Sequence, residues 1–137
     1  MSPAYISASI RRLVRERAGG RCEYCLLPEE TAFFAHEPDH IVAQKHGGGT
    51  VEDNLAYSCF DCNRFKGSDI ASLDPIDGQM VALFNPRSDQ WRDHFLVREG
   101  EIVPLTPVGR VTVRLLKLNL PERLEVRRAL GAFGRYP

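Results

Sequence analysis

The spacing of apolar residues predicts a helix near the start of the chain. In residues 7–18, Ile10 and Val14 lie one helical turn apart and share a face. Two glycines at 19–20 follow, and glycine readily takes the left-handed conformation that closes many helices. The sequence therefore predicts an N-terminal helix that is followed at once by a turn.

Shorter patterns predict strands around a glycine-rich break in the middle of the chain. Residues 31–36 and 39–44 are expected to form strands, and the three glycines at 47–49 are expected to form a flexible loop. A short helix is expected over residues 63–67.

The second half of the chain is less regular. Strands are expected at 79–85 and 95–105, the second interrupted by a turn at Glu99-Gly100. Residues 107–118 have helical spacing, and a last helix is expected at about 121–133, because proline is common at the first helical position.

A chain of 137 residues fits one domain, and no internal repeat or linker divides it. We therefore expect a single α+β domain over residues 1–137. Its metal-bound core would cover about residues 20–70, and a mixed extension of strands and helices would cover about residues 71–137.

Composition and charge exclude some classes of function. No apolar run is long enough to span a bilayer, and the N-terminus lacks a secretory pattern, so we expect a cytoplasmic protein without membrane contact. Lys plus Arg and Asp plus Glu both number 18, which argues against a protein that coats nucleic acid by bulk charge alone. A basic stretch that includes Arg11 and Arg15 nevertheless lies in the predicted first helix.

Four cysteines form two Cys-x-x-Cys pairs, Cys22 with Cys25 and Cys59 with Cys62. Two such pairs can supply a tetrahedral thiolate site for a structural Zn²⁺ ion. Separate buried cysteines or a redox pair are the alternatives. A matched second pair favours zinc, because a redox motif does not need one.

Residues 36–40 formally match the H-E-x-x-H pattern of zinc proteases. That chemistry needs a continuous helix, so that both histidines face one metal. Pro38 lies between them and disfavours a helix, so we set the protease interpretation aside.

Several short motifs together resemble the HNH endonuclease family in its zinc-clamped form. In chain order they are Asp39-His40-Ile41, the glycine-rich loop, Asn54-Leu55, and Cys59-x-x-Cys62-Asn63 followed by Lys66-Gly67. The resemblance covers about residues 20–70. It implies a ββα-metal core that is stapled by the four-cysteine zinc site.

The resemblance also implies roles for individual residues. His40 corresponds to the general base, Asp39 and Asn63 to the ligands of one divalent ion, and Asn54 to the asparagine that ties the loop to the strand. Asp39 and Asn63 replace the family's first and last histidines, and their oxygen atoms favour Mg²⁺ or Mn²⁺.

The chemistry of these residue types agrees with phosphodiester hydrolysis. A histidine with a pKa near 6.5 can accept a proton from water at cellular pH, and a divalent ion stabilises charge on the phosphate. The sequence therefore favours a metal-dependent endonuclease that nicks DNA or cuts both strands. No small-molecule cofactor is expected, and a homodimer is left open.

Three alternatives remain at this stage. Neighbours in a regular strand point to opposite faces, so Asp39 and His40 could not both serve one site there. In the first alternative, Asp39 and His40 are only a turn pair and Asn63 only caps a helix. Four basic side chains are expected to contact nucleic acid: Arg64, Lys66, Arg11 and Arg15. In the second alternative, they only lie on solvent-exposed helix faces. The third is a non-catalytic zinc-binding module that binds nucleic acid or a protein partner.

Overall fold

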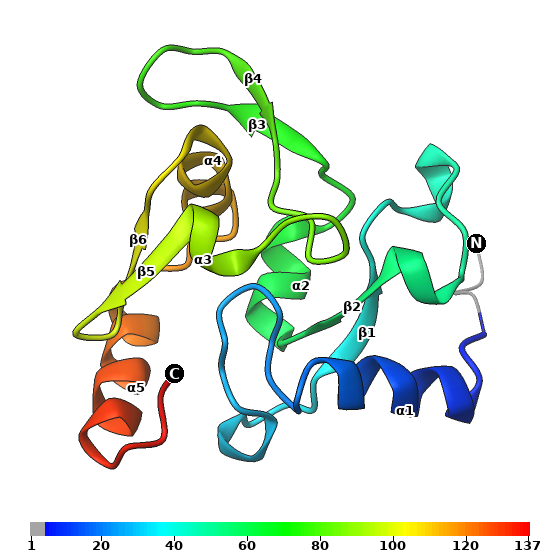
Figure 1. Cartoon of the computed structure of the whole chain (residues 1–137), viewed down its shortest axis with the longest axis horizontal. Coiled ribbons are helices and arrows are strands. Elements are labelled where there is room, and N and C mark those ends of the chain that lie inside the picture. The colour runs from blue at the N-terminus through cyan, green and yellow to red at the C-terminus, as the bar shows by residue number, and fades with distance from the viewer. Residues whose placement is uncertain (1–4) are drawn as a thin grey trace.

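The computed structural model describes residues 5–137 and has a mixed α+β architecture, as expected (Figure 1). The α-helices are α1 (Ala8–Arg17), α2 (Phe60–Lys66), α3 (Trp91–His94), α4 (Pro107–Leu115) and α5 (Pro121–Ala132). Short 3-10 helices are η1 (Glu29–Thr31), η2 (Gln44–His46) and η3 (Glu52–Asn54). The strands are β1 (Glu37–His40), β2 (Leu55–Ser58), β3 (Ala71–Leu73), β4 (Met80–Ala82), β5 (Phe95–Arg98) and β6 (Glu101–Pro104). They form three antiparallel pairs, β1-β2, β3-β4 and β5-β6.

The predicted N-terminal helix is confirmed as α1. It begins after Ser7, whose hydroxyl accepts a hydrogen bond from the Ile10 amide, as expected of an N-cap. Val14 is fully buried in a cluster with Leu55 and Tyr57 of β2. The apolar face of α1 therefore packs on the β1-β2 pair.

The centre of the molecule is the β1-β2-α2 unit. Asp39 pairs with Ala56 and His40 with Leu55, and the chain then turns directly into α2. The helix was predicted over residues 63–67, but it begins earlier, at Phe60. Cys59 is its N-cap, because the Cys59 sulfur accepts a hydrogen bond from the Cys62 amide.

Two strand predictions in this region are wrong or displaced. Residues 31–36 form no strand: η1 is followed by irregular chain, in which Phe33 and Phe34 are exposed and gain no burial from strand pairing. The strand predicted at 39–44 is instead β1, which ends at His40. Its partner β2 was missed because all four of its residues are buried, so its sequence does not alternate.

The C-terminal extension follows the predicted order of elements with different bounds. The strand expected at 95–105 is confirmed as the β5-β6 hairpin, with positive φ angles at Glu99 and Gly100 in its turn. The strand predicted at 79–85 is shorter and pairs with β3, which was not predicted. The helix expected over 107–118 ends at Leu115, and α5 begins at Pro121 as expected.

The extension packs against the segment that follows α1. One buried cluster joins Cys22 and Tyr24 of that segment to Phe95 and Leu118 of the extension. The Trp91 indole donates to the Tyr24 carbonyl at 2.9 Å. In Figure 1 the C-terminus lies beside the loop after α1, where the Tyr136 hydroxyl donates to the Cys25 carbonyl at 2.7 Å.

Among residues 5–137, no helix has the length and apolar character needed to cross a bilayer.

We expect Thr112→Val to destabilise the extension by about 1–3 kcal/mol. The buried Thr112 hydroxyl accepts from the Phe84 amide at 2.9 Å and donates to the Val108 carbonyl at 2.7 Å. Valine fills the space but leaves the Phe84 amide without a partner. Urea denaturation should show the loss, and Thr112→Ser should restore most of it. Equal stability of the valine and serine variants would contradict the role of the hydroxyl.

Candidate active site and metal centre

The two cysteine pairs come together in the folded chain. Cys22 and Cys25 lie in the turn after α1, and Cys59 and Cys62 lie at the start of α2. All four Sγ atoms are within 4.8 Å of one another, and all four residues are buried. The sequence prediction that the pairs form one cluster is therefore confirmed, and this cluster can hold a metal ion.

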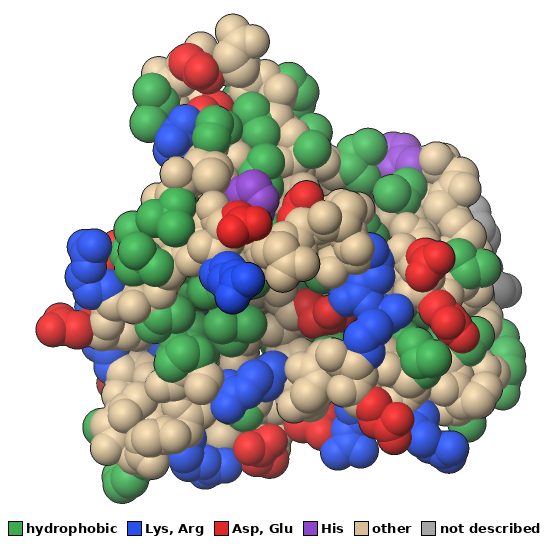
Figure 2. All heavy atoms as spheres, viewed as in Figure 1, with side chains coloured by type: hydrophobic (Ala, Val, Ile, Leu, Met, Phe, Trp, Pro, Cys, Tyr) green, Lys and Arg blue, Asp and Glu red, His purple; other side chains and the backbone are tan. Residues whose placement is uncertain are grey.

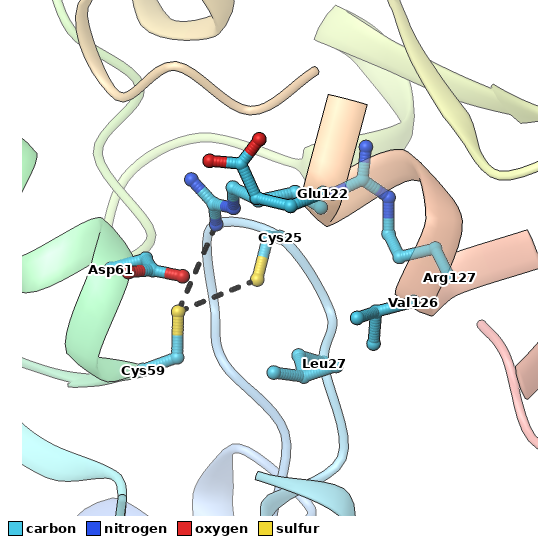
Figure 3. Close-up of a pocket in the computed structure, with 8 residues that line it drawn as sticks. Cys25, Leu27, Cys59, Asp61, Glu122, Val126 and Arg127 are labelled. Atoms are coloured by element: carbon cyan, nitrogen blue, oxygen red, sulfur yellow. Dashed lines mark hydrogen bonds between the residues drawn. The ribbon is translucent and has the colours of Figure 1, made fainter. Parts of the chain in front are cut away.

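The sulfur geometry fits zinc. Cys25 Sγ and Cys59 Sγ are 3.7 Å apart (Figure 3). Zn–S bonds of about 2.3 Å put the sulfurs of a tetrahedral site about 3.8 Å apart. Backbone amides of Cys25 and Cys62 approach Cys22 Sγ and Cys59 Sγ at 3.5 and 3.4 Å, as donors to thiolates would. Four thiolate donors with nearby amides form a donor set suited to Zn²⁺.

A buried arginine of the extension is part of this centre. The Arg123 guanidinium, on α5, donates to Cys62 Sγ at 3.0 Å and approaches Cys59 Sγ at 3.9 Å. Burial opposes its charge, but the electrostatic attraction of Cys62 and the other thiolates outweighs this effect and raises the pKa of Arg123. Sequence reasoning missed Arg123 because it lies about sixty residues after Cys62, and no motif links them.

The hollow beside this cluster shows how α5 approaches α2. Figure 3 places Cys59 and Asp61 of α2 on one side and Val126 and Arg127 of α5 on the other. The extension therefore covers the cysteine cluster with a helix that carries positive charge toward the sulfurs.

Asp39 and His40 point to different partners. Asp39 Oδ2 lies 3.4 Å from the Lys66 ammonium on α2, whereas His40 Nε2 lies 2.8 Å from the Thr50 hydroxyl. Burial raises the pKa of Asp39, and the charge of Lys66 opposes this rise. Asp39 Oδ2 is buried and makes no hydrogen bond with the described residues, so the nearby Lys66 ammonium is the cation that faces it.

Lys66 lies in a different place from that expected of a surface contact to phosphate. It is only 2% exposed, and its ammonium donates to the His40 carbonyl at 3.0 Å. A buried ammonium is costly unless it is paired, and here its charged neighbour is Asp39. Lys66 therefore fixes the end of β1 against α2.

Asn54 binds the glycine-rich loop with its side chain. Its Oδ1 accepts from the Val42 amide at 2.9 Å, and its Nδ2 donates to the carbonyls of Val42 and Gly49 at 2.9 and 2.8 Å. Thr50, which contacts His40, directly follows the glycines. The loop was expected to be flexible, but it is held at several points beside His40.

The other predicted nucleic-acid contacts lie on exposed surfaces. Arg64, one residue after the partly buried Asn63, is 3.0 Å from Asp61. Arg11 and Arg15 of α1 pair with Glu37 and Glu29 at 2.7 and 2.5 Å. Figure 2 accordingly shows basic and acidic side chains interspersed over this face, not gathered into one basic surface.

We expect Arg123→Met to weaken zinc affinity by about 10- to 100-fold, because the thiolates lose a charged hydrogen-bond donor. Competition with a chromophoric chelator measures this affinity. Arg128→Met is the matched control, because the Arg128 guanidinium is exposed and donates to the Glu99 carbonyl instead. Equal zinc affinity for both variants would show that Arg123 does not support the cluster.

We expect Gly48→Ala to destabilise the loop by about 1–3 kcal/mol. A Cβ atom at Gly48 would lie 1.8 Å from the Val42 carbonyl oxygen and 2.8 Å from Asn54 Nδ2. At Gly49 the nearest atom would be 3.8 Å away, so Gly49→Ala is the control. Thermal and urea denaturation should separate the two variants, and similar stabilities would refute the close packing of this loop.

Comparison with known proteins agrees with the resemblance to HNH endonucleases that the sequence motifs indicated. Residues 22–69 match the model of the HNH endonuclease family. No curated protein and no solved structure matched the chain. The matched segment contains the four-cysteine cluster, the β1-β2 pair and α2. Residues 22–69, about a third of the chain, are therefore similar to the HNH endonuclease family, and this segment carries the four-cysteine cluster.

Proposed function

We propose that the protein is a metal-dependent endonuclease that hydrolyses phosphodiester bonds of DNA. The observation that carries the proposal is the meeting of β1 and α2. Asp39, His40 and Lys66 lie in contact there, and Asn63 lies one helical turn before Lys66. This proposal assigns the four cysteines to a structural zinc ion and the β1-α2 junction to catalysis.

In this proposal Asp39 and Asn63 hold one divalent ion, Mg²⁺ or Mn²⁺. Asp39 Oδ2 is a buried carboxylate oxygen without a hydrogen-bond donor among the described residues, which suits a cation ligand. When bound, the ion would stabilise negative charge on the phosphate and on the leaving oxygen. The Lys66 ammonium already provides positive charge beside Asp39.

His40 is proposed as the general base. If Nε2–H donates to the Thr50 hydroxyl, the lone pair is on Nδ1, and this atom accepts the proton of the attacking water. Thr50 would then fix both the tautomer and the direction of the ring. Asn54, by holding the loop that carries Thr50, would keep this hydrogen bond in place.

Neighbours in one strand can serve one site here because His40 is the last residue of β1. Asp39 is directed to α2, and His40 is directed to the loop that follows the strand. A substrate phosphate between the loop and α2 would therefore have the base on one side and the metal ligands on the other.

We expect His40→Ala to lower the cleavage rate at least about 100-fold, because proton transfer by a positioned side chain contributes about 10²–10⁴-fold. The assay uses supercoiled plasmid and zinc-loaded protein, with Mg²⁺, Mn²⁺, Ni²⁺ or Zn²⁺ added in turn. His46→Ala is the control, because His46 is exposed and lies outside the proposed constellation. Cutting that needs a divalent ion and survives only in the control would support the proposal.

The opposite result favours a different class of function. If wild-type protein retains zinc and its fold yet cuts no plasmid with any ion, the non-catalytic zinc-binding module becomes the better interpretation. Cutting by His40→Ala at the wild-type rate would instead overturn the assignment of the base.

A further inference from the structure

Three phenylalanines form an exposed aromatic cluster beside α2. Phe33, Phe34 and Phe60 are 95%, 52% and 49% exposed. The ring centroids of Phe33 and Phe34 are 5.0 Å apart, and those of Phe34 and Phe60 are 4.6 Å apart with an interplanar angle of 33°. Contiguous exposed apolar surface of this kind marks a site of interaction, because leaving it in water is costly.

These rings line a groove between the loop after η1, the start of α2, and α5. Leu27, Val126 and Arg64 also line this groove. We call this surface the aromatic groove. It is separate from the Asp39–Lys66 contact but shares helix α2 with it.

Two cations lie against aromatic rings of α2, and one of them, Arg64, also lines the aromatic groove. The Arg64 guanidinium lies 5.7 Å from the Phe60 centroid and 4.2 Å from the Phe65 centroid. The Lys117 ammonium lies 5.0 Å from the same Phe65 ring. Arg64 has Asp61 as a counter-charge, whereas Lys117 makes no ion pair with a described residue. Arg64 therefore places a cation against two rings of α2, and Lys117 adds a second cation at Phe65.

The aromatic groove and the proposed catalytic junction both include residues of the seven-residue helix α2. Phe60 and Arg64 are four residues apart and share one face of α2, and Asn63 lies on the adjacent side of the same helix. A strand that reaches Asn63 with its phosphate would therefore pass the aromatic groove within a few nucleotides.

We propose that the aromatic groove binds an unpaired stretch of the nucleic-acid strand that is cut, with Phe34 and Phe60 stacking on bases and Arg64 and Lys117 contacting phosphates. This inference rests on the proposed function and adds a substrate class: DNA with unstacked bases next to the cleavage site. Bases in a continuous duplex are stacked on both faces and offer none to a ring, whereas a single strand presents flat bases and charged phosphates together.

Binding distinguishes this proposal from the proposed activity. The probes are a fluorescent oligothymidylate of about 12 nucleotides and a hairpin duplex of similar length, within the range of known single-strand sites. Fluorescence anisotropy is measured on the zinc-loaded 137-residue chain without added Mg²⁺, so that cutting plays no part. We expect tighter binding of the single strand than of the duplex.

Variants assign the affinity to particular side chains. Phe60→Ala should weaken single-strand binding by roughly 5- to 100-fold, the usual range for loss of one stacking ring. Phe133→Ala is the matched control, because Phe133 is 82% exposed but does not line the groove. Lys117→Ala should reduce the slope of log affinity against log salt by about 0.7, as expected for one lost phosphate contact to a single strand.

Two results would overturn the proposal. One is duplex binding at least as tight as single-strand binding, with no effect of Phe60→Ala beyond that of Phe133→Ala. The other is a change of sedimentation on Phe60→Ala without any change in nucleic-acid binding, which would assign the groove to a second copy of the chain. If the protein cuts no plasmid but still prefers the single strand, the proposed endonuclease activity is contradicted. The proposed single-strand site in the aromatic groove is then still supported.

Discussion

The contact between the two cysteine pairs determines where the central helix lies. Cys22 and Cys25 belong to the turn after α1, and Cys59 and Cys62 belong to the start of α2. The β1-β2 pair has only four residues in each strand and α2 only seven, so none of these elements is stable alone. Coordination of a structural zinc contributes on the order of 10 kcal/mol in small domains, enough to compensate for such short elements.

The position of α2 in turn brings the proposed catalytic residues together. Lys66, at the end of this helix, reaches β1 and contacts both Asp39 and the His40 carbonyl. The extension acts on the other end of the helix, where Arg123 donates to Cys62 Sγ. One short helix is thus held at its first turn by sulfur chemistry and at its last turn by a buried ammonium.

Basic and acidic side chains are interspersed on the surface, and several of them form ion pairs. The arginines of α1 that the sequence suggested as nucleic-acid contacts are engaged with Glu29 and Glu37. The exposed side of α2 instead combines Phe60 with Arg64 and, across Phe65, with Lys117. The proposed binding of a single strand would depend on these few cations beside flat aromatic faces and not on net charge.

Features that depend on spacing along the chain could be predicted from the residues alone. The cysteine pairs, the helical period of residues 7–18 and the hairpin turn at Glu99-Gly100 were all predicted, because each is a local pattern with a physical cause. The HNH motifs could be recognised for the same reason, because their order and spacing are local features of the sequence. Other features could not be predicted in this way. The burial of Lys66 against Asp39, the approach of Arg123 to Cys62 and the exposure of Phe33 and Phe34 depend on packing between residues far apart in sequence, which no local period encodes.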